Sequence, residues 1–263
     1  LLSSVYEGDI PRIDYNEVRP AGSRLKTFGG RASGPDPLRK LFEFTIGVCK
    51  GAAGRKLNSI EVHDIMCMIG ELVVVGGVRR SALISLSNLT DKRMRDAKSG
   101  AWYNDHPYRG LANNSVAYTE RPDSETFMEE WLALVKSKSG ERGIFNRVAS
   151  QAQAGRWGRR DPLLSYGTNP CSEIILRDKQ FCNLTEVVVR GNDTESTLAN
   201  KVSLATILGT IQSTLTSFQF LSEEWKKNTA VESGLNTSSS TGKPFSLRNG
   251  YIGSFLSILT LLM

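Results

Sequence analysis

The stretch Ala82-Leu83-Ile84-Ser85-Leu86 is a short apolar run with the length and composition of a buried strand. It follows a helical pattern that starts after Asn58 and ends near Gly76-Gly77. Asn58 is suited to cap this helix, and Glu61 stands three residues further on, as in a capping box. The apolar stripe of the predicted helix consists of Val62, Ile65, Met66, Ile69 and Val73.

Helical and strand patterns alternate along the rest of the chain. Helices are predicted over 38–50, from Asp123 or Ser124 through Phe127, Trp131, Leu134 and Val135, and over 198–215; strands are predicted over 115–119 and 184–189. Residues 18–37 are rich in turn-forming residues, and 155–170 form a Gly/Arg-rich loop. This alternation predicts an α/β architecture.

The composition is that of a globular protein. The chain has 263 residues, of which 40% are hydrophobic and 23% charged, enough for one large domain or two small ones. The net charge of +6 and pI of about 9.2 fit an anionic partner such as a nucleotide or a nucleic acid. The same charge also fits scattered, solvated basic side chains, so charge alone does not decide between these interpretations.

The four cysteines are Cys49, Cys67, Cys171 and Cys182. The first residues lack the pattern of a secretory signal, so a cytoplasmic location is expected and structural disulfides are not. There is no Cys-x-x-Cys motif and there are two histidines, which argues against a structural zinc site. The apolar run Ser254–Met263 is too short to span a bilayer as a helix.

The segment Asn169-Pro170-Cys171-Ser172-Glu173-Ile174 places an amide, a thiol and a carboxylate within five residues. On an extended or looped backbone, residues 169, 171 and 173 point the same way and can face one small molecule. Pro170 stiffens the loop, which suits a group held close to a substrate. The alternative is that Cys171 is a small buried hydrophobic residue, as free cysteines often are.

This segment resembles the finger loop of class II, adenosylcobalamin-dependent ribonucleotide reductases. Other segments resemble the monomeric branch of this family that reduces ribonucleoside triphosphates, and they occur in the same order. They are Tyr6–Pro11, Arg24–Pro35, Glu61–Cys67, Gly76–Ala82, Leu111–Ser115 and Gly143–Arg147. Several motifs in order are far more specific than one, and the resemblance extends from the first residue to about residue 230.

The resemblance implies an α/β fold, part of the ten-stranded barrel of ribonucleotide reductases with a central finger loop, incomplete in this chain. Residues 1–233 would be a partial catalytic barrel, and 234–263 a low-complexity and apolar tail foreign to the family. The implied cofactor is adenosylcobalamin, with a ribonucleoside triphosphate as substrate, a dNTP effector and a thioredoxin-type reductant. The parent enzyme would be a monomer, without nucleic-acid or membrane partners.

The resemblance also implies roles for four residues. Cys171 matches the thiyl radical residue, which removes the 3′ hydrogen of the ribose. Glu173 matches the base that takes the proton of the 3′ hydroxyl, and Asn169 matches the amide that holds the ribose hydroxyls. Cys182 matches one of two reducing cysteines; its family partner lies before Leu1, so the chain is expected to be inactive alone.

Two further segments carry weaker predictions. The loop with Arg79, Arg80 and Ser81 resembles the one that passes effector identity to the substrate site, and two Arg donors there could bind phosphate or base edges. Gly30 and Ser33 belong to a glycine-rich stretch that could let the backbone approach a nucleotide. Solvated turns are the alternative for both segments. By contrast, we interpret Cys49, Cys67 and His63 as structural.

Three other functions are conceivable from the sequence. A class I reductase is disfavoured by the position of Pro170 and the long match to the monomeric type. A non-catalytic nucleotide- or nucleic-acid-binding module would need a basic stripe with stacking aromatics, for which Arg156-Trp157-Gly158-Arg159-Arg160 is the one local hint. An inactive remnant is disfavoured by the intact motif at 169–173. The abrupt loss of similarity after about residue 233 suggests a truncated reading frame.

Overall fold

The computed structural model describes residues 1–25, 30–72, 74–75, 78–79, 81–138, 142–158, 160–172, 174–183 and 185–237. The chain divides into two compact units, Leu1–Phe145 and Asn146–Met263, and each is described by itself. The predicted tail falls outside the described residues from 238 onward. Likewise, the predicted boundary between 233 and 234 remains a prediction.

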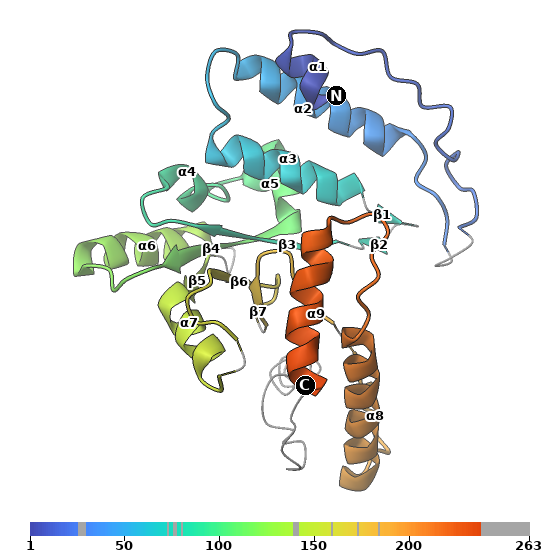
Figure 1. The fold of residues 1–263 in the computed structure, drawn as a ribbon. Helices are drawn as coiled ribbons and strands as arrows, with labels where there is room; N and C mark the ends of the chain where they lie inside the picture. Colours follow the sequence, from blue (N-terminus) through green and yellow to red (C-terminus); the bar gives the residue numbers. More distant parts are fainter. Residues whose placement is uncertain are drawn as a thin grey trace. The chain divides into compact units, whose positions relative to one another are not determined.

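The first unit is mostly helical, with short strands between the helices (Figure 1). Its elements are α1 (Leu2–Tyr6), α2 (Asp36–Gly51), α3 (Ser59–Leu72), β1 (Val74–Val75), β2 (Val78–Arg79), β3 (Leu83–Ser87), α4 (Lys92–Arg95), α5 (Trp102–Asp105), the 3₁₀ helix η1 (Pro107–Leu111), β4 (Ala112–Tyr118), α6 (Ser124–Ser137) and β5 (Gly143–Asn146). The predicted helices at 38–50 and from Asp123 are thereby confirmed, as are the strands at 82–86 and 115–119.

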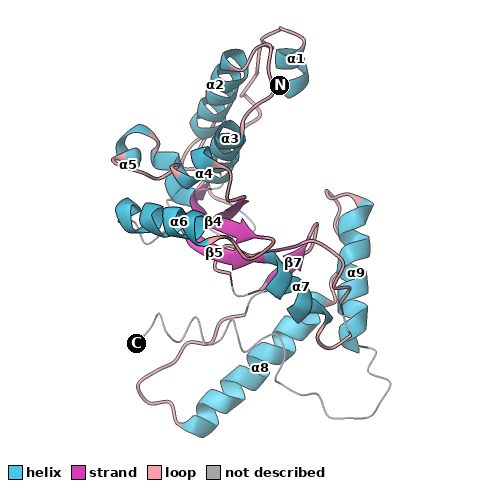
Figure 2. Cartoon of the chain, turned by 90° about the vertical axis from the view of Figure 1, so that its left-hand side faces the viewer, coloured by secondary structure: helices cyan, strands magenta, loops and turns pink. Residues whose placement is uncertain are grey.

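The first unit contains a small sheet with the order β3-β4-β5, which lies beside α6 (Figure 2). Strands β3 and β4 are parallel, in a register that pairs Leu83 with Ala112 and Ser87 with Val116. Parallel neighbours need a long crossover, and residues 88–111 provide it with α4, α5 and η1. The α/β class is therefore confirmed. The described residues form one three-stranded and two two-stranded sheets, so the ten-stranded barrel is not confirmed.

The helix α3 begins with the predicted capping box. The backbone N–H of Glu61 donates to Asn58 Oδ1 at 3.0 Å, and the N–H of Asn58 donates to the Glu61 carboxylate at 2.8 Å. The predicted apolar stripe is not the buried face, however: Val62, Met66 and Ile69 are exposed. The residues that α3 buries are His63, Asp64, Cys67 and Gly70.

The buried face of α3 is polar because Asp64 has partners from η1. Arg109 donates to both carboxylate oxygens of Asp64, at 2.7 and 2.6 Å, and the Tyr108 hydroxyl lies 3.3 Å from Oδ2. His63 Nδ1 lies 3.1 Å from Asp64 Oδ1, and its Nε2 lies 3.3 Å from Asn114 Oδ1 on β4. His63 is thus part of the packing between α3 and β4, which agrees with a structural role. A buried carboxylate is tolerated when it is paired in this way.

Asp64 makes the stability of the first unit depend on pH. Burial raises the pKa of this carboxyl, but hydrogen bonds from His63 and Arg109 outweigh burial and lower it. A lowered folded-state pKa stabilises the protein above the unfolded pKa, near 4, and this contribution is lost as pH falls below that value. We therefore expect the destabilisation caused by Asp64→Asn, measured by urea unfolding, to be large at pH 6 and to shrink below pH 4. The exposed Asp105→Asn is the control; an effect of Asp64→Asn that is independent of pH would contradict this assignment.

Glu130 is the buried residue of α6, although the apolar side chains Phe127, Trp131 and Val135 of the predicted stripe are exposed. Its carboxylate accepts from Arg95 Nε at 2.5 Å and from Arg142 Nε at 2.8 Å. Arg95 also pairs with Glu129 at 3.0 Å. One buried carboxylate therefore links α4, α6 and the residue before β5.

The second unit contains α7 (Arg147–Gly155), β6 (Tyr166–Thr168), β7 (Ile175–Arg177), α8 (Glu195–Ser213) and α9 (Glu223–Thr237). The predicted helix over 198–215 is confirmed as α8, which Thr194 caps. The strand predicted over 184–189 is wrong for 185–189, which have no regular structure, and Leu184 lies outside the described residues. Valines favour strands only where a neighbouring strand pairs with them. No helix among the described residues is long and apolar enough to cross a membrane.

Candidate active site

The described residues of the predicted site segment, 169–172 and Ile174, lie between β6 and β7, which pair as a hairpin (Figure 1). The two strands are antiparallel and pair Tyr166 with Arg177, Gly167 with Leu176 and Thr168 with Ile175. The turn itself is tight, because the N–H of Ser172 donates to the Asn169 carbonyl at 2.9 Å. Pro170 occupies the second position of this four-residue turn, where its fixed φ is favourable. Ser172 follows with a φ of +65°, in the left-handed region.

Asn169 fixes the turn through its side chain. Its Oδ1 accepts the N–H of Ile174 at 3.0 Å, and its own N–H donates to the Ile174 carbonyl at 3.3 Å. The side chain is buried as a result. Simple alternation does not describe residues 169–172, because the backbone turns there. Glu173, the predicted base, lies outside the described residues, so its place beside Asn169 and Cys171 remains a prediction.

Cys171 is exposed at the third position of the turn. The alternative of a buried hydrophobic cysteine is therefore wrong for this residue. Cys182 is half-buried in the segment that follows β7. It adjoins Phe181, whose ring packs against Phe218 and Trp225 with centroids 4.6 and 4.8 Å apart.

The cysteines differ in the reactivity that their surroundings allow. Burial, with a contribution from the charge of Asp64, raises the pKa of the fully buried Cys67 thiol to about 11. Alkylation requires an accessible thiolate. We expect iodoacetamide at pH 8 to modify Cys171 first and Cys67 last in the folded chain, with similar rates for all four cysteines in urea. Peptide mass spectrometry measures the order; equal rates for Cys171 and Cys67 in the folded chain would refute the assigned burial.

The predicted nucleotide-binding residues lie in the other unit. Ser81 donates its hydroxyl to the Gly70 carbonyl at 2.5 Å and so joins the strand region to α3. Arg79 ends β2, with only its backbone described, and Arg80 lies outside the described residues. Gly30 is exposed with a φ of +82°, and Ser33 is exposed beyond the bridge between Arg24 and Arg31. Binding of a substrate or effector by these residues remains a prediction.

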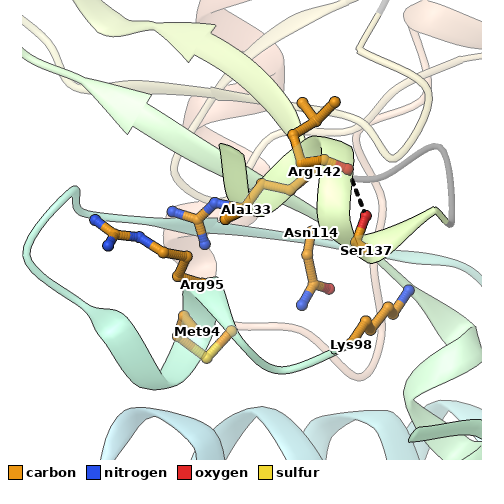
Figure 3. A pocket seen from close by; sticks show the side chains of 8 residues that line it. Met94, Arg95, Lys98, Asn114, Ala133, Ser137 and Arg142 are labelled. Atoms are coloured by element: carbon orange, nitrogen blue, oxygen red, sulfur yellow. Dashed lines mark hydrogen bonds between the residues drawn. The ribbon is translucent and has the colours of Figure 1, made fainter. Parts of the chain in front are cut away.

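Two cavities in the first unit are too small for a nucleotide. The one in Figure 3 is lined by Arg95, Lys98, Asn114 and Arg142, together with Met94, Ala133, Leu134 and Ser137. Its volume is about 10 Å³, as is that of a second cavity beside Tyr118 and Glu130. Each holds about one water molecule. Within the described part of the chain, no three His, Cys, Asp or Glu side chains come together as metal ligands.

The sequence did not single out the side chains that hold the hairpin. Arg160 donates to the Ile175 carbonyl and to Gln180 Oε1, both at 2.8 Å, and its guanidinium lies 4.7 Å from the centre of the Tyr166 ring. Arg177 donates to the Asn228 carbonyl of α9 at 2.8 Å. The Gly/Arg-rich composition of the 155–170 loop is the sequence signal for Arg160, but composition alone does not indicate that this arginine binds the hairpin.

Comparison with known proteins agrees with the resemblance. Proteins named adenosylcobalamin-dependent ribonucleoside-triphosphate reductase, from Lacticaseibacillus paracasei and Lactobacillus leichmannii, are 37% and 36% identical to this chain over 183 residues. That from Lactobacillus delbrueckii subsp. bulgaricus is 36% identical over the same length. Each match covers 66% of this chain and 23% of the relative. No protein-family profile and no solved structure matches the chain.

Over the matched region, therefore, this chain is homologous to ribonucleotide reductases. The relatives are of the adenosylcobalamin-dependent, ribonucleoside-triphosphate-reducing type, and the resemblance seen in the sequence motifs is thereby confirmed. The chain spans about a quarter of the length of these relatives.

Proposed function

We propose that this chain carries the hydrogen-abstracting cysteine of a reductase that converts ribonucleoside triphosphates to 2′-deoxyribonucleoside triphosphates, and that Cys171 is this residue. The observation that carries the proposal is an exposed thiol at the turn of a hairpin whose backbone Asn169 fixes. The homology to reductases supports the same function. Exposure matters because the sulfur must reach both a radical source and a sugar.

A thiol suits this chemistry because its S–H bond is weak enough to be broken by a cofactor radical. The resulting thiyl radical takes the hydrogen atom from ribose C3′, so that an S–H bond forms and the radical moves to C3′. The substrate radical then loses its 2′ hydroxyl as water, with the proton supplied by a thiol of the reducing pair to which Cys182 belongs. Holding the sulfur in a rigid turn favours the transfer, because an error of about 1 Å in position can cost roughly 100-fold in rate.

Three neighbours have proposed roles in the later steps. Glu173 takes the proton of the 3′ hydroxyl as the 2′ hydroxyl leaves, a kind of transfer that contributes about 10²–10⁴-fold. The Oδ1 of Asn169 already accepts the Ile174 amide, so we assign the donation to the ribose hydroxyls to its NH₂ group. Cys182 supplies reducing electrons by forming a disulfide with a second cysteine.

Binding of the phosphates or the effector is proposed for Arg79, Arg80, Ser81, Gly30 and Ser33. A dNTP effector, a thioredoxin-type reductant and a monomeric parent enzyme are part of the same proposal, as is a cytoplasmic location. Adenosylcobalamin is the cofactor in the name of the relatives, and we propose it as the radical source. The two cavities of about 10 Å³ do not fit a corrin ring.

The non-catalytic nucleic-acid-binding module is not favoured. In the Arg156–Arg160 segment, Arg156 lies over its neighbour Trp157 at 5.0 Å, and Arg160 is bound to the hairpin. Two of the three arginines thus have partners within the chain.

The test is a chimera of the Lacticaseibacillus paracasei relative in which residues 1–233 of this chain replace the corresponding region. We expect the chimera to form deoxyribonucleotide from a ribonucleoside triphosphate when adenosylcobalamin and a thioredoxin-type dithiol are supplied. A chimera that folds and binds the cofactor but yields no deoxyribonucleotide would count against the proposed function.

A further inference from the structure

The hairpin that presents Cys171 is too short to be stable by its own pairing. It has three residue pairs, from Tyr166–Arg177 to Thr168–Ile175. An isolated two-stranded hairpin is at best marginally stable in water. Its geometry must therefore be held by groups outside the two strands.

Arg160 is placed to hold it, because it contacts both strands at once. Its Nη1 donates to the Ile175 carbonyl on β7, and the guanidinium face lies over the Tyr166 ring on β6. Its Nη2 donates to Gln180 Oε1, which also accepts the backbone N–H of Arg177 at 3.1 Å. One planar group thus links the two strands to the segment that follows them.

These contacts need the shape of a guanidinium as well as its charge. Arg160 is half-buried, and its two Nη groups reach two different acceptors while its face covers an aromatic ring. A guanidinium presents its donors in a rigid fork and stacks on aromatic faces, whereas a lysine ammonium is a single point charge on a flexible stem. Lysine at this position would not reproduce all three contacts.

The link from Arg160 to the cysteine is short. The Ile175 carbonyl that Arg160 binds follows directly on Ile174, whose N–H is held by the Asn169 side chain. Asn169 in turn closes the turn that contains Cys171, by accepting the N–H of Ser172. A shift of Ile175 would be passed through Ile174 and Asn169 to the sulfur.

We propose that Arg160 is a positioning residue for Cys171, which holds the 169–172 turn in place by joining β6, β7 and Gln180. This inference rests on the proposed function for the importance of the sulfur's position, but the placement of the turn is independent of it. Arg160 itself is not expected to touch substrate.

The first experiment uses the chain itself and follows amide hydrogen exchange, with Arg160→Gln as the variant and Arg156→Gln as the matched control. Losing two hydrogen bonds should speed exchange of the amides in 166–177 roughly tenfold or more. Exchange in α3 and α8 should not change, nor should the urea midpoint of the first unit. Arg156→Gln should leave the hairpin unchanged, because Arg156 contacts Trp157 and is exposed.

Two more variants keep the proposal testable if Arg160→Gln fails to fold. Gln180→Ala removes the acceptor shared by Arg160 Nη2 and the Arg177 N–H, and should also speed exchange of the same amides. Arg160→Lys should not restore wild-type exchange. Unchanged hairpin exchange in Gln180→Ala and Arg160→Gln, or full restoration by Arg160→Lys, would overturn the positioning role.

The second experiment measures Arg160→Gln in the active chimera. A misplaced sulfur should lower kcat with little change in KM, whereas a general loss of folded protein would reduce the active fraction and leave the kcat of that fraction unchanged. If the wild-type chimera is inactive, the proposed function fails, and the exchange experiment still decides the role of Arg160.

Discussion

Replacing Cys171 by serine in the chimera is expected to abolish deoxyribonucleotide formation. The O–H bond of serine is much stronger than an S–H bond, so a cofactor radical cannot readily oxidise the hydroxyl, and no radical is available to take the 3′ hydrogen. The exchange of cofactor hydrogen with solvent should be lost together with turnover, since it depends on the same sulfur. The change is nearly isosteric at an exposed position, so the fold should be retained.

Two controls separate this result from general damage. Cys49→Ser alters a half-buried cysteine on α2 and should leave turnover largely intact. Cys182→Ser should stop turnover driven by a thioredoxin-type reductant but leave cofactor hydrogen exchange possible. Turnover by Cys171→Ser at a rate near wild type would show that the roles are assigned wrongly.

Glu130→Gln is expected to destabilise the first unit by about 3–5 kcal/mol, the usual cost of removing one partner of a buried ion pair. The side chain of Glu130 is 4% exposed, and those of Arg142 and Arg95 are 5% and 11% exposed. The substitution keeps the shape of the side chain but leaves two nearly buried guanidinium groups without their shared counter-charge. The free energy of unfolding, measured by urea denaturation of the whole chain, reports the loss.

Glu129→Gln is the matched control, because Glu129 pairs with the same Arg95 from an adjacent position. Its side chain is 53% exposed, and exposed ion pairs contribute only about 0–1 kcal/mol. Added salt should reduce the small effect of Glu129→Gln and leave that of Glu130→Gln nearly unchanged, because buried pairs are screened less. Equal losses in the two variants would argue against a buried Glu130.

Secondary structure was predicted best where the signal is local. The box formed by Asn58 and Glu61 and the cap that Asp123 makes to the Thr126 N–H at 2.8 Å join residues three apart. These capping hydrogen bonds join residues that are close in sequence, so they depend little on the rest of the fold. Both helices therefore start where predicted. The strand expected at 184–189 depended on pairing with a neighbour, which no local pattern could reveal.

The buried faces of the helices could not be predicted in the same way. Periodicity pointed to Val62 and Trp131, but the structure buries Asp64 and Glu130 instead. Their partners Arg109 and Arg95 lie 45 and 35 residues away in the sequence. A carboxylate can be buried only where a partner such as an arginine pairs with it. The tertiary fold decides whether an arginine from a distant segment lies close enough to do so.

For the candidate site, the motif alone located the turn, its proline and its cysteine, because a tight turn is specified by adjacent residues. The sequence by itself also determined the α/β class and the reductase resemblance. Only the tertiary structure showed that Cys171 is exposed and that Arg160 contacts both β6 and β7, the strands on either side of the turn. The exposure of Cys171 and the contacts of Arg160 with both strands depend on which segments of the chain lie close together in space. The sequence pattern does not give the distances between such segments.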